Sequence, residues 1–104
     1  MLNEFWAAMQ CGRHHGKANK FRDRGELEKA IIHFVQALPY AERTGNKGTI
    51  AFEMECIATT YQEMNKLSEA KKYAENSLSI YRTLAEGNKD NFFLLELLLV
   101  LNCY

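Results

Sequence analysis

The chain has 104 residues, of which 47% are hydrophobic and 25% charged, as is usual for a soluble globular protein. Lys+Arg and Asp+Glu are balanced at 13 each, so the net charge favours neither nucleic acid nor acidic lipid as a partner. The length suits a single domain covering residues 1–104. Three well-separated cysteines exclude a closed disulfide framework, and the first residues lack the basic start of a signal peptide. Both features favour a cytoplasmic location.

Apolar residues recur at steps of three and four along the chain, and no segment alternates with a period of two, so the sequence predicts an all-α fold. The first helix is expected to contain Gly12 and Gly16, each of which costs a helix about 1 kcal/mol relative to alanine. The second contains Pro39, where we expect a kink or an irregular final turn. Five helices are predicted, at about residues 3–23, 26–44, 47–64, 68–85 and 90–104.

Glycine and asparagine fall where the apolar runs end. Gly25, Asn65 and the two Gly-Asn-Lys segments that start at Gly45 and Gly87 are placed to close helices in the left-handed conformation. Ser68 precedes the fourth run and is a candidate N-cap.

An internal similarity appears when the sequence is shifted by 40 residues. Small, aromatic and turn residues then coincide in order: Ala18 with Ala58, Phe21 with Tyr61, Gly25 with Asn65, Leu27 with Leu67, Ala30 with Ala70, Ala37 with Ser77 and Leu38 with Leu78. Each unit reads as two helices that pack against each other, with alanines allowing close approach and an aromatic ring beside them.

This order resembles the tetratricopeptide repeat (TPR), which runs large, leucine, small, aromatic, glycine turn, alanine, aromatic and small. The second unit supplies Met54, Ile57, Ala58, Tyr61, Asn65, Leu67, Ala70, Ala74, Ser77 and Leu78; the first supplies His14, Lys17, Ala18, Phe21, Gly25, Leu27, Ala30, Phe34, Ala37 and Leu38. Both units lack the terminal proline, and His14, Lys17 and Ala74 depart from the usual residue types. The period of about 40 residues is similar to the extended TPR variety of cell-polarity adaptors and kinesin light chains.

The resemblance implies an antiparallel helix-pair solenoid of about two and a half repeats, at 3–44, 47–85 and 90–104. It further implies a concave groove lined by the first helix of each repeat. The groove residues expected from the alignment are His15, Asn19, Arg22, Phe52, Glu55, Thr59 and Gln62.

Catalytic and metal-binding patterns are sparse. Cys11 with His14 or His15 could offer two ligands on one helical face, but structural zinc needs four, and His33 stands alone in the sequence. Glu53, Glu55 and Glu63 read with Gln62 as the solvated side of a helix. We therefore predict no catalytic residue, no cofactor and no metal.

The segment "NFFLLELLLVLNCY" (residues 91–104) has nine apolar residues among the ten from 92 to 101. It is too short for a membrane span, which needs about 20. The alignment makes it the first helix of a third repeat, and Phe92, Leu95 and Leu99 are expected to form an exposed apolar interface.

The favoured function is a non-enzymatic protein-interaction module of TPR type that binds a protein or peptide. It would use the groove and the apolar C-terminal helix, which also makes a homo-oligomer possible. Two alternatives stay open: a self-associating or truncated piece of a larger solenoid, and, more remotely, a small metal-binding helical protein.

Overall fold

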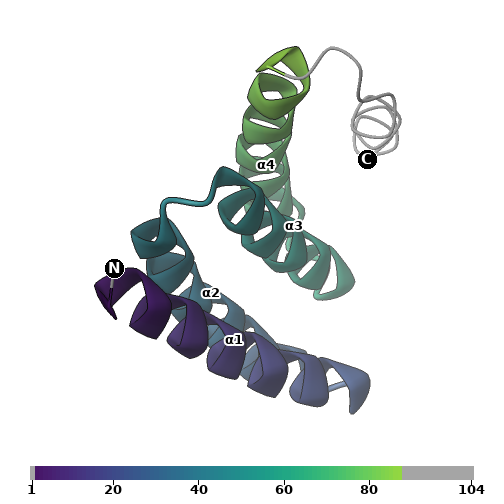
Figure 1. Cartoon of the computed structure of the whole chain (residues 1–104). Helices are drawn as coiled ribbons and strands as arrows, with labels where there is room; N and C mark the ends of the chain where they lie inside the picture. Colours follow the sequence, from purple (N-terminus) through teal and green to yellow (C-terminus); the bar gives the residue numbers. More distant parts are fainter. Residues whose placement is uncertain (1, 88–104) are drawn as a thin grey trace.

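The structure, a computed structural model, describes residues 2–87, which form four α-helices joined by short turns (Figure 1). These are α1 (Leu2–Asp23), α2 (Leu27–Thr44), α3 (Lys47–Glu63) and α4 (Leu67–Gly87). The all-α prediction is confirmed for this part of the chain, and each boundary lies within two residues of the predicted one. The predicted helix 90–104 lies outside the described residues, as do Phe92, Leu95 and Leu99.

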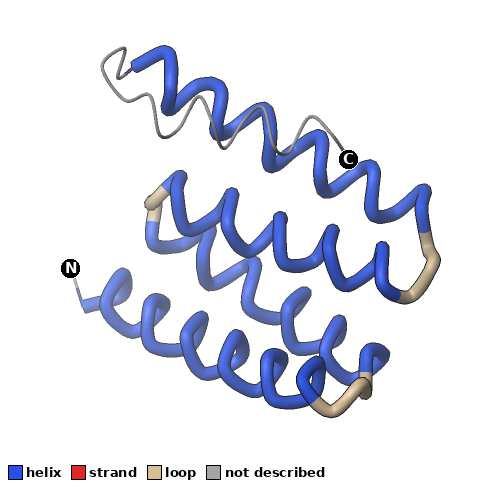
Figure 2. Tube along the Cα trace, turned by 90° about the vertical axis from the view of Figure 1, so that its right-hand side faces the viewer, coloured by secondary structure: helices blue, strands red, loops and turns tan. Residues whose placement is uncertain are grey.

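The four helices form two hairpins, α1 with α2 and α3 with α4, and α2 packs against α3 between them (Figures 1 and 2). Over residues 2–87 the molecule is built of helices and turns alone (Figure 2).

The turns within the two hairpins have equivalent geometry. Gly25 and Asn65 both adopt left-handed backbone, with φ of 79° and 61°. The amide of each donates to the carbonyl three residues earlier, at 2.9 and 3.0 Å, and the next amide donates to the carbonyl five residues earlier, at 2.9 Å in both turns. This pair of bonds is the Schellman arrangement that closes a helix. The same turn conformation thus reverses the direction of the chain at residues 25 and 65.

Small residues lie where the helices approach each other. Ala18 and Ala30 are fully buried, and their counterparts Ala58 and Ala70 are buried as well. An alanine at these positions adds little bulk between two helix backbones, so larger side chains can fill the space beside it.

The main core lies between the two hairpins. Phe34 of α2 and Ile57 of α3 are its largest fully buried apolar side chains, and Phe21, Leu38, Tyr61, Met64 and Tyr73 pack against its edge. Ser77, at the position equivalent to Ala37, is also fully buried, and its hydroxyl donates to the Ala51 carbonyl at 2.9 Å. This bond between α4 and α3 satisfies a hydroxyl that would otherwise be costly to bury.

The turn that joins the two hairpins, between α2 and α3, has a different geometry from the turns within them. Gly45 ends α2 in the left-handed conformation, with φ of 71°, and Asn46 caps α3 by accepting a hydrogen bond from the Thr49 amide at 3.0 Å. Asn46 therefore starts a helix rather than ending one.

Two local predictions need correction. Ser68 was expected to cap the fourth helix but lies inside its first turn, because α4 begins at Leu67. Of the kink or irregular final turn expected at Pro39, the irregular turn is not observed, since α2 continues as α-helix to Thr44. Pro39 is exposed, and so is Val35, the residue whose carbonyl loses its amide partner.

None of the helices within residues 2–87 combines the length and the apolar character that crossing a bilayer requires.

Candidate partner-binding face

The candidate site is the face formed by α1 and α3, the first helices of the two hairpins. Asn19 and Gln62 are exposed there, and Phe52 keeps 46% of its surface accessible. The other predicted groove residues are half-buried: His15, Arg22, Glu55 and Thr59. The face therefore presents amide groups and one large aromatic ring to solvent.

His15 connects the two helices near the middle of this face. Its Nδ1 lies 2.9 Å from Oε1 of Glu53 on α3, and its ring lies 5.4 Å from that of Phe52. The other edge of the imidazole meets Phe34 in an edge-to-face contact, also with centroids 5.4 Å apart. The structure thus brings the predicted residues His15 and Phe52 together, with a carboxylate beside them.

Glu53 is the residue of this site that the sequence interpretation missed. It was predicted to be solvated, which is wrong, because only 3% of its surface is accessible. Burial raises the pKa of its carboxyl group, and the neighbouring His15 partly offsets that shift. Its Oε2 has no hydrogen-bond partner among the described residues. The sequence did contain a signal for this burial, because Glu53 lies one helical turn before the buried Ile57 and therefore on the same face of the helix.

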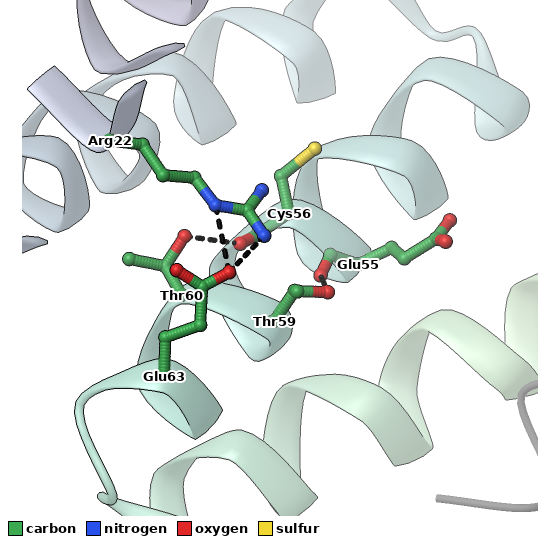
Figure 3. Close-up of polar contacts among 6 residues, drawn as sticks. All are labelled: Arg22, Glu55, Cys56, Thr59, Thr60 and Glu63. Atoms are coloured by element: carbon green, nitrogen blue, oxygen red, sulfur yellow. Dashed lines mark hydrogen bonds and ion pairs between the residues drawn. The ribbon is translucent and has the colours of Figure 1, made fainter. Parts of the chain in front are cut away.

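Arg22 and Glu63 form a second contact between α1 and α3 (Figure 3). The Arg22 Nε donates to Glu63 Oε1 at 3.0 Å, and Nη2 donates to the same oxygen. Both side chains reach solvent, so the pair adds little stability, on the order of 0.2–1 kcal/mol. It does fix the position of the Arg22 guanidinium at the end of the face.

Glu55 contacts α4, and Thr59 contacts its own helix, α3. The Tyr81 hydroxyl of α4 donates to Glu55 Oε2 at 3.1 Å, and the pKa of Tyr81 is raised by burial and by this carboxylate. Thr59 donates back to the Glu55 carbonyl at 2.9 Å. In Figure 3 the Glu55 carboxylate points away from the Arg22–Glu63 pair. Glu55 is therefore held toward α4 rather than toward α1.

The two described thiols are poor nucleophiles. Cys11 and Cys56 are buried, and burial together with nearby carboxylates raises their pKa to about 11 and about 12. Both thiols are therefore protonated at neutral pH, and Cys11 Sγ lies 3.7 Å from Glu53 Oε1.

The sequence offered Cys11, His14 and His15 as possible metal ligands, but these three side chains do not all lie on the same side of α1. Cys11 and His15 meet Glu53, whereas His14 lies against α2 beside His33, with the two Nδ1 atoms 3.5 Å apart. Within residues 2–87, no three His, Cys, Asp or Glu side chains are placed to hold one ion. His33, which stands alone in the sequence, thus has His14 as a neighbour in the fold.

Comparison with known proteins adds no relative: no protein-family model, curated protein or solved structure matches the chain. The resemblance to TPR proteins therefore depends on the residue pattern alone and stays a prediction.

Proposed function

We propose that this chain is a non-enzymatic protein-interaction module of TPR type that binds an extended or helical peptide on the face formed by α1 and α3. The observation that carries the proposal is the equivalence of the two hairpin turns at Gly25 and Asn65, which supports the interpretation of α1 and α3 as the corresponding first helices of two repeats. Repeated helical hairpins commonly present such corresponding faces to a ligand.

The chemistry of the face suits a peptide. Asn19 and Gln62 offer amide donors and acceptors, and the exposed Phe52 ring offers an apolar contact. Arg22 is held by Glu63, so its remaining donors are available to a carbonyl or carboxylate without a large loss of side-chain entropy. A peptide that combines polar and apolar side chains would meet these groups.

The test is a selection of peptides from a random-sequence display library on the purified full chain, followed by affinity measurement. Asn19→Lys with Gln62→Lys should weaken binding at least tenfold. The matched control is Gln36→Lys with Asn76→Lys, which changes the same amides at exposed positions on α2 and α4, the second helices of the hairpins. Equal loss in both double variants, or failure to select any peptide, would contradict the proposal.

A competing function is self-association through the apolar run at 92–101, which lies outside the described residues. Sedimentation of the native chain and of the Leu95→Glu/Leu99→Glu variant decides this point. A native monomer would exclude self-association, whereas a native oligomer that dissociates in the variant would support it. The cytoplasmic location remains part of the same proposal.

A further inference from the structure

The side of α2 that is turned away from α1 and α3 is exposed along the length of the helix. α2 packs against α1 on one side and against α3 on the other. Its exposed residues share a single arc of about 140° around the helix axis, because each residue advances the helix by about 100°. These residues are Glu28, Lys29, Ile32, Val35, Gln36, Pro39, Glu42 and Arg43. We call this surface the α2 outer face.

Apolar side chains form a line along the centre of the α2 outer face. Ile32 and Pro39 lie seven residues apart, nearly two helical turns, and Val35 lies between them, to one side. Ile32 is 54% exposed and Val35 is 37% exposed. The corresponding residues of α4, 40 positions later, are all exposed and polar: Lys72, Glu75 and Ser79. The internal repeat therefore does not account for the apolar line on α2.

Residues of opposite charge flank the apolar line in two rows with a spacing of seven. The acidic row is Glu28, Val35 and Glu42, and the basic row is Lys29, Gln36 and Arg43. Nζ of Lys29 lies 5.6 Å from the ring centroid of Phe21 on α1. Cζ of Arg43 lies 5.8 Å from the ring of Tyr40, which itself contacts α1. The basic row therefore borders α1, and the acidic row lies on the side toward α3.

This arrangement is complementary to a second copy of itself in parallel orientation. When two α2 helices lie side by side about a two-fold axis along their length, the acidic row of each copy meets the basic row of the other. Glu28 then faces Lys29 of the second copy, and Glu42 faces its Arg43, each contact occurring twice by symmetry. Ile32 meets its own counterpart at the centre. An antiparallel pair would instead bring Glu28 against Glu42, with like charges facing each other.

We propose that two copies of this chain associate in parallel through the α2 outer face. Eight exposed residues per copy are fewer than the roughly 20–30 of a standard interface, so the dimer is weak and forms at high concentration. The proposal is separate from peptide binding on the α1–α3 face and from association through the run at 92–101, because it uses neither set of residues.

Sedimentation equilibrium tests the proposal on the native chain and on the Leu95→Glu/Leu99→Glu variant, in which the run at 92–101 is disrupted. We expect both to form dimers at concentrations up to about 1 mM, as suits a small interface. Added salt should weaken the dimer, because the facing charges are exposed to solvent. A native chain that stays monomeric, or a native dimer that is lost in the variant, would overturn the proposal.

Exchanging charges between the rows tests the contact itself, again in the Leu95→Glu/Leu99→Glu chain. Glu28→Lys/Glu42→Lys makes both rows basic, and Lys29→Glu/Arg43→Glu makes both acidic, so each change should weaken self-association at least tenfold. An equimolar mixture of the two should recover dimers that contain one chain of each kind. Such recovery shows that both variants are folded, so their loss of self-association is not a folding defect.

The matched control is Glu75→Lys/Glu86→Lys, which changes exposed glutamates of α4 and should leave self-association within twofold. A mixture that stays monomeric, or an equal loss in this control, would refute the α2 contact.

Disulfide trapping tests the parallel orientation. In chains with Cys103→Ser, mild oxidation of an equimolar mixture of Ile32→Cys and Pro39→Cys should join each variant mainly to its own kind, because equal positions meet in a parallel pair. Mass spectrometry of the linked peptides distinguishes the products. Links mainly between positions 32 and 39 would show an antiparallel pair and contradict the proposal.

Discussion

Gly25 and Asn65 occupy corresponding positions 40 residues apart and close their turns with the same left-handed backbone and the same two hydrogen bonds. Glycine adopts positive φ without steric cost, and asparagine is among the few other residues that tolerate it. Two different residue types therefore adopt the same backbone conformation. At these two turns the internal sequence similarity corresponds to a shared local structure.

Alanine substitutions of two glycines near one end of α1 should have opposite effects. Gly25→Ala forces a Cβ into the left-handed region and should destabilise the protein by about 1 kcal/mol. Gly16→Ala, inside α1 with open space around the added Cβ, should stabilise it by about 0.5–1 kcal/mol. Urea denaturation measures both changes in the free energy of unfolding. Changes of the same sign would contradict the assigned turn geometry.

The helices and turns could be predicted because their signals are local. The steps of three and four in apolar residues placed four helices within two residues of their observed ends, and Gly25, Gly45 and Asn65 marked three of the stops. The prediction of Ser68 as the N-cap of the fourth helix was wrong because, in sequence alone, a serine in the first turn of a helix looks the same as a serine at its N-cap. Which hydroxyls and carboxylates are buried depends on tertiary packing, and this information is not local.

Truncation of the central core ring should be far more damaging than truncation of a neighbouring exposed side chain. Phe34 is fully buried between the hairpins, so Phe34→Ala should cost about 3–5 kcal/mol. Ile32 lies two residues away on the same helix but is 54% exposed, and Ile32→Ala should change stability by less than about 1 kcal/mol. Thermal and chemical unfolding of the two variants compares them directly. Similar losses would mean that α2 is rotated from the described orientation.

The candidate face was predicted less completely than the fold. The alignment identified His15 and Phe52, which do meet, but it gave no indication that Glu53 lies buried beside them. It also left His33 without a neighbour, although His14 lies against it. Both contacts join residues on different helices. A helical stripe in one segment shows which face is apolar, but not which polar residue another helix places against it.

Thiol reactivity should report the burial of the cysteines. With pKa values of about 11 and about 12, Cys11 and Cys56 carry roughly one thiolate in a thousand molecules or fewer at pH 8. Iodoacetamide at pH 8 should therefore leave both unmodified in the native chain over a time that labels them fully in denaturant. Peptide mass spectrometry reads each site separately. Rapid native labelling of Cys56 would show that the interior of the α2–α3 interface is open to solvent.

The buried carboxyl group of Glu53 should give the protein a measurable pH dependence. Its pKa is raised in the folded state, so the native chain binds this proton more tightly than the unfolded chain, whose glutamate has a pKa of about 4.3. The stability contributed by Glu53 is therefore fully present below that pH and is lost as pH rises through the higher folded value. Glu53→Gln stays neutral at every pH, and its free energy of unfolding should lack this loss.

The measurement is a series of urea titrations from pH 4 to pH 8 on the native chain and two variants. The control Glu28→Gln changes an exposed glutamate of α2 and should keep the native slope. The difference between native and Glu53→Gln should change in one direction, with the native chain losing stability relative to the variant as pH increases. A parallel pair of curves would show that Glu53 ionises as freely in the folded chain as in the unfolded one. The opposite slope would mean that the contact with His15 outweighs the cost of burial.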